Sequence, residues 1–533
     1  MLALALLSML APLAQASGYY FTDAGTRGMS RGGAFIASAN DLSAQYYNPA
    51  ALINLKRDQF YVNHSLVSQQ IAFKRQDYVE NDDGYVGNEQ APAIGYDGEP
   101  LPGGYPAATN VAAPMNIPQL AVGSSLGLEN AYFAFGLHPP FAPQVVYEDG
   151  VRDGVEPTGP QRYNLVDSLV IQFYAGPSAA YRVLPWLTLG ASLNMTYVSA
   201  TYGINLMICQ DDLTDDLTNR CPADAAGSQN DIGVGLEMAD PFRFTWNAGL
   251  LAEPNDWMKI GFSVLPPLKV NGSGDIQARF AEDHWMAAGD GEGNFDVLGS
   301  MTAADSDVTV QLTMPWVFRS GLAVQPTDRS VVELSGVYQR WSMTEEIRVT
   351  DLNLTIPLTE FLGDDLDDVV LTDDVVIPAD YEDAWSIRLG GEAEVIEPLS
   401  LRAGTFYETS AIPVQTQAVS LVDGPKFGYG LGATYWHKKN KRRVFSLDAG
   451  FSQTFISERT ITGSQIRRQE IPINLPDVLA GEVNANIVPG LGVGNGTMAS
   501  SMTFFSAGAT VYWGRSAENR DRASAPTGAP PTG

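Results

Sequence analysis

Apolar and polar residues alternate in a series of segments between residues 58 and 514. A period of two is the pattern of β-strands, because successive side chains of a strand point to opposite faces. Short turns and long polar stretches separate these segments alternately. Six turns and seven long stretches join fourteen strands, so we predict an all-β, antiparallel fold. The turns lie at residues 128–130, 184–186, 253–256, 326–329, 397–399 and 437–443, and the long stretches lie near residues 74–117, 139–161, 207–231, 271–306, 350–383, 410–425 and 458–500.

The two faces of these strands predict which residues contact lipid. Every second residue between 308 and 318, and again at 322 and 324, is apolar, and we expect these side chains to face outward. They are Val308, Val310, Leu312, Met314, Trp316, Phe318, Leu322 and Val324. In the stretch 384–395 we expect Trp385, Ile387 and Leu389 to face outward and Ser386 to face inward.

A soluble β-sandwich also alternates, but several features together favour a membrane protein. An even strand number, with short turns at one end and long loops at the other, is typical of outer-membrane barrels. Charged residues make up only 17% of the chain and hydrophobic residues 45%, and no apolar run is long enough for a helical membrane span. We therefore predict a 14-stranded antiparallel transmembrane β-barrel over residues 58–514, in the outer membrane of a Gram-negative bacterium.

The two ends of the chain differ from the barrel segments. Residues 1–16 are an apolar run that ends in Ala14-Gln15-Ala16, the pattern of a signal-peptidase site, and we expect an exported protein that starts at Ser17. A short buried helix is the alternative. Residues 515–533 contain no aromatic or large aliphatic side chain, and we expect a disordered tail.

Residues 17–57 are rich in small residues and end in a proline-containing segment. Glycine permits tight turns and close packing, and proline cannot continue a strand ladder. We expect a compact plug, the hatch, that packs inside the barrel. Its characteristic residues are Gly28, Gly32, Gly33, Asn48, Pro49 and Ala50.

The net charge of −29 argues against nucleic acid or an anionic membrane surface as a partner. Eleven acids and no base lie between Thr350 and Asp383. These acids predict a solvated loop, or one that faces lipopolysaccharide through bridging divalent ions. Calcium binding is the other possibility, although the spacing is not that of an EF-hand. We predict no protein-bound metal.

Two cysteines and four histidines limit the chemistry further. Cys209 and Cys221 lie in one polar stretch without other metal ligands nearby, so we predict a disulfide that closes a loop and contributes about 3 kcal/mol. The histidines lie far apart in the sequence, and neither a GxSxG nor an HExxH motif is present. We expect no enzymatic activity and no cofactor.

The stretch Tyr46-Tyr47-Asn48-Pro49-Ala50, followed by fourteen predicted strands, resembles the FadL-type outer-membrane transporters of long-chain fatty acids and other hydrophobic compounds. Residues 312–316, 385–391, 401–407 and 412–414 extend the resemblance through the C-terminal half. The resemblance implies a hatch that plugs a monomeric barrel. It also implies a lateral opening at a kink in the third strand, where Phe135, Gly136, Pro139, Pro140 and Phe141 lie. Trp513 is the nearest equivalent of the terminal aromatic residue that such barrels present to the outer-membrane barrel assembly machinery.

Four arginines are candidates for holding a carboxylate head group inside the barrel. Strand alternation points Arg243, Arg319, Arg388 and Arg402 inward, and arginine binds carboxylates through a two-pronged fork. The alternative is that each arginine pairs with a carboxylate of the barrel interior, such as Glu333, Glu392 or Asp448.

The function predicted from these features is passive uptake of hydrophobic compounds, chiefly long-chain fatty acids. Capture at the extracellular loops would be followed by binding beside the hatch and lateral exit through the barrel wall. One alternative within the family is transport of aromatic or aliphatic hydrocarbons, which need no arginine. A surface adhesin or structural barrel, with the acidic loops as its working part, is an alternative of a different class.

Overall fold

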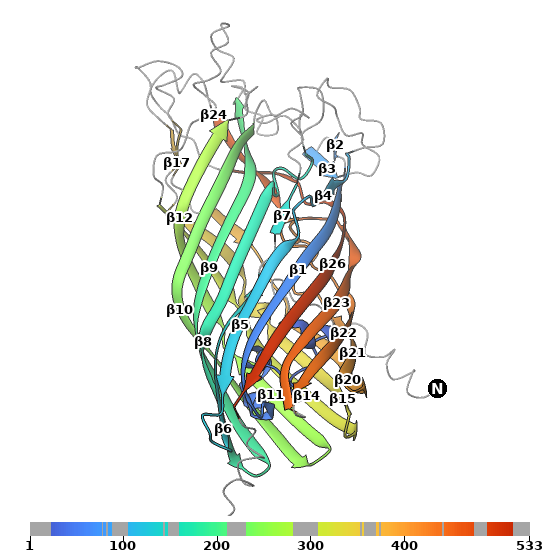
Figure 1. Ribbon diagram of the computed structural model, residues 1–533. Coiled ribbons are helices and arrows are strands. Elements are labelled where there is room, and N and C mark those ends of the chain that lie inside the picture. The colour runs from blue at the N-terminus through green and yellow to red at the C-terminus, as the bar shows by residue number, and fades with distance from the viewer. Residues whose placement is uncertain are drawn as a thin grey trace, which may run out of the picture.

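The computed structural model describes residues 23–76, 78–81, 84–87, 105–141, 144–147, 159–210, 231–280, 307–351, 354–356, 369–371, 375–439, 442–473 and 488–514. In these residues the chain forms a closed antiparallel β-barrel of fourteen strands, as predicted (Figure 1). The barrel closes where β1 pairs with β26, from Asp58 opposite Trp513 to Arg75 opposite Gly496. No helix within the described ranges is long and apolar enough to cross a membrane.

Several of the fourteen wall strands consist of two segments. The wall is formed by β1 (Asp58–Arg75), β5 (Met115–Ser124), β6 (Ala131–Phe141) with β7 (Gln144–Val146), β8 (Asp167–Leu184), β9 (Leu187–Gln210), β10 (Asp231–Asn255), β11 (Met258–Leu265) with β12 (Leu268–Phe280), β13 (Asp307–Met314) with β14 (Trp316–Thr327), β15 (Ser330–Arg340) with β16 (Glu346–Thr350), β19 (Val375–Pro378) with β20 (Ala384–Ile396), β21 (Leu399–Glu408), β22 (Lys426–Lys439), β23 (Arg442–Ile461) and β26 (Gly496–Trp513). The long connections carry β2 (Tyr78–Asn81), β3 (Gly84–Gly87), β4 (Ala108–Thr109), β17 (Leu354–Ile356), β18 (Val369–Leu371), β24 (Arg467–Ile473) and β25 (Val488–Gly492). The six predicted turns all join neighbouring strands at one end of the barrel.

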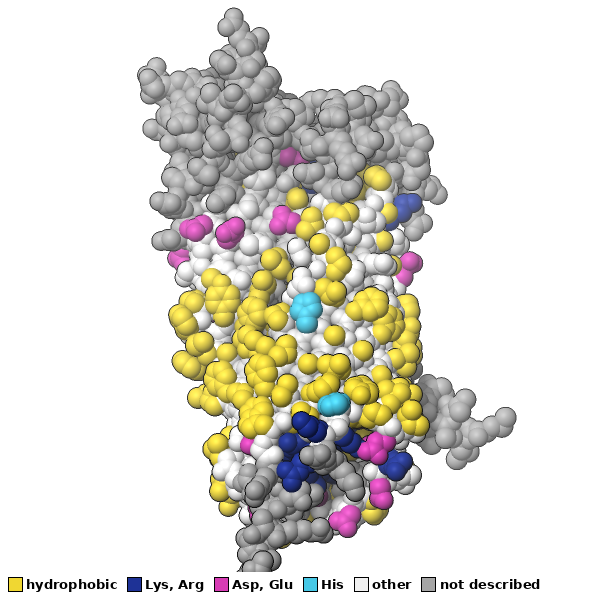
Figure 2. All heavy atoms as spheres, viewed as in Figure 1, with side chains coloured by type: hydrophobic (Ala, Val, Ile, Leu, Met, Phe, Trp, Pro, Cys, Tyr) yellow, Lys and Arg dark blue, Asp and Glu magenta, His cyan; other side chains and the backbone are white. Residues whose placement is uncertain are grey.

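The outer surface of the barrel carries a belt of apolar side chains. Trp385, Ile387 and Leu389 of β20 are 39 to 50% exposed, whereas Ser386 and Arg388 between them are buried. Figure 2 shows the hydrophobic side chains gathered around the middle of the barrel. A surface of this kind is suited to lipid, so the predicted faces of β20 are confirmed.

The prediction for residues 308–314 is wrong. Val308, Val310 and Met314 point into the barrel and are at most 4% exposed. The reason is Pro315, which separates β13 from β14: β13 pairs with β12 and β16, while β14 pairs with β11 and β15. The alternation therefore changes phase at the proline, and the outward face holds only from Trp316 onward. Pro266 and Pro267 separate β11 from β12 at the corresponding point of the preceding strand.

Residues 23–55 lie inside the barrel and contain α2 (Thr26–Ser30), α3 (Ala44–Tyr47) and the 3₁₀ helix η1 (Pro49–Asn54). Every residue of α2 and α3 is buried. The segment contacts the strands β1, β8, β10, β21 and β23, which stand on several sides of the barrel.

Several predictions concern residues outside the described ranges. They are the signal peptide, residues 17–22 of the hatch, Cys221 and therefore the disulfide with Cys209, most of the acidic stretch 350–383, and the tail 515–533. The domain boundaries at residues 16, 57 and 514 remain predictions.

Candidate ligand-binding site

Glycines on the inner wall let the hatch backbone approach the strands. At Gly190 of β9, an added Cβ atom would lie 2.2 Å from the backbone nitrogen of Ala50. At Gly404 of β21 it would lie 2.1 Å from the carbonyl carbon of Arg31. Real Cβ atoms do not come this close, so a side chain at either position would push the hatch away from the wall. Similar contacts occur at Gly249, Gly261, Gly321, Gly390 and Gly430.

The hatch residues predicted from the sequence have defined contacts. Gly32 and Gly33 adopt positive φ angles of 60° and 75°, which favour glycine, and Gly28 leaves room for the ring of Tyr47. The side-chain Nδ2 of Asn48 donates hydrogen bonds to the backbone carbonyls of Ile36 and Leu250. The side-chain Oδ1 of Asn48 accepts a hydrogen bond from the backbone N–H of Ala50 at 3.1 Å. Pro49 starts η1. These bonds tie the end of the hatch to its own middle and to β10.

A buried carboxylate holds the centre of the hatch. Glu333 of β15 accepts the backbone N–H groups of Ile36 at 2.5 Å, Ala37 at 3.1 Å and Ser38 at 2.9 Å. The guanidinium of Arg31 lies 3.7 Å from the same carboxylate. Hydrogen bonds to an ionised acceptor are stronger than neutral ones, so Glu333 is a strong attachment point between hatch and wall.

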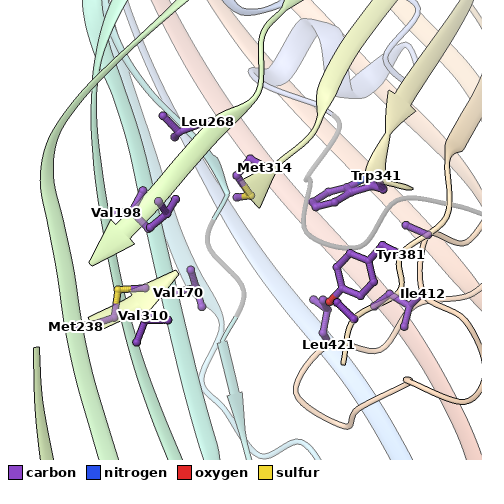
Figure 3. Close-up of a cluster of buried hydrophobic side chains, with 14 of the residues drawn as sticks. Val170, Val198, Met238, Leu268, Val310, Met314, Trp341, Tyr381, Ile412 and Leu421 are labelled. Atoms are coloured by element: carbon purple, nitrogen blue, oxygen red, sulfur yellow. The ribbon is translucent and has the colours of Figure 1, made fainter. Parts of the chain in front are cut away.

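On the long-loop side of the hatch, apolar side chains from opposite sides of the barrel gather in its interior (Figure 3). We call this group the apolar lumen cluster. Its members are Ile36, Val170, Tyr174, Val198, Ala200, Leu206, Ile232, Met238, Leu265, Leu268, Val270, Ile276, Val308, Val310, Met314, Val317, Val337, Trp341, Val349, Ala379, Tyr381, Ala384, Ala411, Ile412 and Leu421. Polar interiors are usual in transmembrane barrels, so this cluster distinguishes the upper lumen from that of a water-filled pore.

The sequence reasoning missed the apolar lumen cluster because it assigned Val308, Val310 and Met314 to the lipid face. The signal that could have found them is proline within an alternating run. Pro266, Pro267 and Pro315 lie on neighbouring strands, and each lacks the N–H group that a continuous ladder requires. At these prolines the inward and outward positions of the strand exchange. The apolar residues between each proline and the long loops therefore point into the barrel.

Arg319 lies directly below the apolar lumen cluster, two residues after Val317 on the inner face of β14. Its guanidinium stacks 4.8 Å from the ring centre of Tyr46, and the residue is 4% exposed. Its Nη1 atom is buried without a hydrogen-bond partner, and no carboxylate of the described residues lies within ion-pair distance. A buried guanidinium with an unmade hydrogen bond is a suitable place for an anionic group.

The other three predicted arginines are already paired. Arg388 contacts Asp23 at 2.6 Å and Glu408 at 2.9 Å. Arg402 contacts Asp448 at 3.1 Å and Glu392 at 3.7 Å, which are two of the carboxylates proposed as its partners.

Arg243 contacts Asp240 at 2.9 Å, and its side chain is 43% exposed. The structure therefore does not gather the four arginines around one ligand. Of the four, Arg319 alone has no carboxylate within ion-pair distance among the described residues.

The region predicted for the lateral opening shows an interrupted ladder. β5 and β6 pair from Ser124 opposite Phe133 only as far as Leu120 opposite Leu137. β5 continues beside β1 to Met115, and β6 continues beside β8 with an irregularity between His138 and Phe141. Pro139 and Pro140 lie in this irregular part and cannot donate to a neighbouring strand. Phe135 and Gly136 belong to the paired part.

His138 connects this region to Arg319. Its ring makes edge contacts with Tyr46 at 6.0 Å and Tyr174 at 6.1 Å between ring centres. Tyr174 belongs to the apolar lumen cluster, and Tyr46 carries Arg319 on its face. At Gly136 an added Cβ atom would lie 2.7 Å from the Gln45 side chain of the hatch. The cluster, Arg319, the hatch and the interrupted ladder thus meet at Tyr46 and His138.

On the turn side of the hatch, a polar cavity of about 740 Å³ opens between the hatch and the strand ends. Arg182, Glu253 and Lys259 line it and form ion pairs of 3.0 and 2.8 Å. Among the described residues, no group of three or more histidine, cysteine, aspartate or glutamate side chains could hold a metal ion.

A closed outer-membrane barrel with an internal segment and an apolar lumen defines a transport protein for hydrophobic compounds. The sequence matches the family model of outer membrane transport proteins (OMPP1/FadL/TodX) over residues 7–487, and the chain belongs to this family. Members of the family are outer-membrane transporters rather than enzymes.

Individual relatives agree with this assignment. Outer membrane protein P1 of Haemophilus influenzae is 25% identical over 82% of this chain and 86% of its own length. The long-chain fatty acid transport protein of Escherichia coli O6:H1 is 22% identical, over 40% of this chain and only 42% of its own length. The crystal structure of a Pseudomonas aeruginosa FadL homologue superposes with a TM-score of 0.66 at 18% identity, covering 93% of this chain and all of that chain. At this identity the superposition supports the fold.

Proposed function

We propose that the protein takes up long-chain fatty acids passively through its barrel. The observation that carries the proposal is the position of Arg319 at the lower edge of the apolar lumen cluster, as a buried cation with no carboxylate within ion-pair distance among the described residues. This pairing of an apolar surface with a single cation matches a molecule with a long hydrocarbon tail and one carboxylate.

Binding of the tail is driven by the apolar lumen cluster. Removing a methylene group from water contributes about 0.8 kcal/mol, so burial of a dozen methylenes contributes roughly 10 kcal/mol. The carboxylate of the fatty acid would accept hydrogen bonds from the buried Nη1 atom of Arg319. Because the ring of Tyr46 covers the guanidinium, the hatch must shift for the head group to leave Arg319.

The exit in this proposal is lateral. After capture at the extracellular loops and binding beside the hatch, the ligand would pass His138 and leave between β5 and β6, where the ladder is interrupted. The path through the turn side of the hatch is less suitable, because ion-paired Arg182, Glu253 and Lys259 line the cavity there. Lateral exit keeps the tail in apolar surroundings throughout.

A second candidate is transport of aromatic hydrocarbons within the same family. Tyr46, His138 and Tyr174 form a continuous series of edge-to-face contacts, a geometry that aromatic ligands also adopt. Such ligands would bind in the apolar lumen cluster without using Arg319.

The test is binding of oleate, hexadecane and toluene to the purified protein in detergent, compared between the wild type and Arg319→Gln. We expect oleate to bind at least tenfold more weakly to the variant, since a hydrogen bond to a charged group contributes about 1.5–3 kcal/mol. Binding of the two hydrocarbons should not change. Arg243→Gln is the matched control, because Arg243 is half exposed and already paired. Unchanged oleate binding in Arg319→Gln, together with tighter toluene binding by the wild type, would favour the hydrocarbon carrier instead.

A further inference from the structure

The turn between β22 and β23 concentrates positive charge at the periplasmic end of the barrel. In the ladder, Lys438 lies opposite Arg443 and Lys439 lies opposite Arg442. Like charges directly opposite each other destabilise a strand pair. Figure 2 shows basic side chains gathered immediately below the hydrophobic belt.

Only part of this charge is neutralised by the protein. Lys438 pairs with Glu397, and Arg443 lies 3.5 Å from Glu394. In the described part of the chain, Lys439 and Arg442 have no carboxylate within ion-pair distance.

Arg57, which precedes β1, also has no carboxylate partner among the described residues. It donates hydrogen bonds to the backbone carbonyls of Arg443 and Gly514. Burial, and then the nearby positive charge of Arg442, lower its pKa. We define Arg57, Lys439 and Arg442 as the basic patch.

The ladder fixes the basic patch at the membrane boundary. Asp58 pairs with Trp513 of β26, and Phe445 pairs with Val511, so Arg443 stands level with Trp513. Trp513 is 43% exposed at the end of the lipid-facing belt, and tryptophan is enriched at the interface between membrane and water. Arg57 and Arg442 each lie one residue beyond this level. The basic patch is therefore at the depth of the lipid head groups.

We propose that the basic patch binds the phosphate of an anionic glycerophospholipid in the periplasmic leaflet of the outer membrane. Guanidinium groups bind phosphate through two parallel hydrogen bonds, and a lysine beside them adds charge. A bound phosphate would offset the repulsion between Arg57, Arg442 and Lys439. The acyl chains of such a lipid would lie along the outward side chains Leu447 and Val511, which are 51 and 49% exposed.

The basic patch is positively charged, whereas the net charge of the whole molecule is negative. The net charge of −29 led us to expect no attraction to anionic membrane surfaces, but eleven of the acids lie in one stretch, residues 350–383, away from the basic patch in the sequence. Attraction to head groups falls off within about 10 Å at ordinary ionic strength, so the local charge decides the interaction. Binding of a phospholipid at the basic patch would not depend on the ligand carried by the lumen.

The experiment is native mass spectrometry of the full-length protein released from a neutral detergent. Phosphatidylglycerol and phosphatidylcholine with identical acyl chains are titrated separately, and inorganic phosphate is added as a competitor. We expect the wild type to prefer phosphatidylglycerol at least tenfold and to keep it in millimolar phosphate. The variant with Arg57→Gln, Lys439→Gln and Arg442→Gln should lose this preference.

Two further variants separate the basic patch from total charge and from folding. A variant with Lys74→Gln, Lys269→Gln and Arg340→Gln loses the same charge at exposed positions away from the basic patch and should keep the preference. The single change Lys439→Gln removes one exposed side chain at the strand end and should weaken the preference severalfold even if the triple variant fails to fold.

Three results would overturn the proposal. The wild type could bind both lipids equally, or the variants of the basic patch could retain the preference for phosphatidylglycerol. Displacement of the lipid by inorganic phosphate would show instead that the basic patch takes up a free anion.

Discussion

At the scale of single residues, the contact between hatch and wall depends on a few buried charged groups. Glu333 is the most connected of them, since its carboxylate accepts three successive backbone N–H groups and the hydroxyl of Ser38. From the sequence we predicted that Glu333 lies in the barrel interior and pairs with an arginine of the barrel wall. Backbone groups are not visible in a sequence pattern, which is why its role as an attachment point was not predicted.

Replacing Glu333 should loosen the hatch. In Glu333→Gln the side chain loses its charge and keeps one acceptor oxygen instead of two, so at least one N–H group of residues 36–38 loses its acceptor. We expect the free energy of hatch opening to fall by about 3 kcal/mol, the usual scale for breaking a buried charged contact. Hydrogen exchange of residues 24–55 measures this directly. Glu346→Gln, at a carboxylate that is partly exposed and paired with Arg348, should leave the exchange unchanged. Equal protection in both variants would contradict the assigned role of Glu333.

Asp23 makes hatch stability depend on pH. Burial raises the pKa of Asp23 to about 6 from its usual 3.8, although the nearby Arg388 opposes this change. Because the folded state holds the proton more tightly than the unfolded state, the stabilisation is complete below pH 4 and is lost as the pH rises through 6. Arg388 retains Glu408 at 2.9 Å when Asp23 is neutral.

We therefore expect the amides around α2 to exchange more slowly at pH 5 than at pH 8, after correction for the intrinsic exchange rate. Asp23→Asn should remove this difference, because the amide imitates the protonated acid at every pH. If the exchange of these amides depends on pH in Asp23→Asn as it does in the wild type, another group causes the pH dependence.

At the scale of the elements, the strands were predicted more accurately than their faces. The strand number, the six turns and the outward face of β20 could be read from alternation and turn residues, because each strand repeats with a period of two. The inward face of β13 could not be read in this way. A proline in the middle of the strand exchanges the inward and outward positions, while every second residue remains apolar. The pairing of Arg388 with Asp23 also depends on a hatch position that local sequence does not encode.

The interrupted ladder between β5 and β6 gives a prediction about transport. Pro139 and Pro140 cannot donate hydrogen bonds, so the double change Pro139→Val and Pro140→Val should allow the ladder to continue. We expect oleate uptake into cells to fall severalfold while oleate binding to the purified protein stays within about twofold. Pro185→Ala, in the turn between β8 and β9, is the control and should transport normally. Unchanged uptake in the double variant would argue for another exit.

At the scale of the whole molecule, three zones follow one another along the barrel. The apolar lumen cluster lies toward the long loops, the hatch fills the middle, and ion-paired residues line the cavity at the turn end. On the outside, the hydrophobic belt ends at Trp513, and the basic patch begins one residue beyond that level. Composition averages over these zones, so a net charge of −29 and a hydrophobic content of 45% could predict a membrane barrel but neither the apolar lumen nor the basic patch.

The most direct test of the proposed function is a crystal structure of the protein with an oleate analogue brominated along its tail. The anomalous signal of bromine locates the tail independently of the protein atoms. The account predicts bromine positions among Val310, Met314 and Trp341, with the carboxylate within hydrogen-bond distance of Arg319. Bromine found only on the outer surface, or a carboxylate far from Arg319, would contradict it.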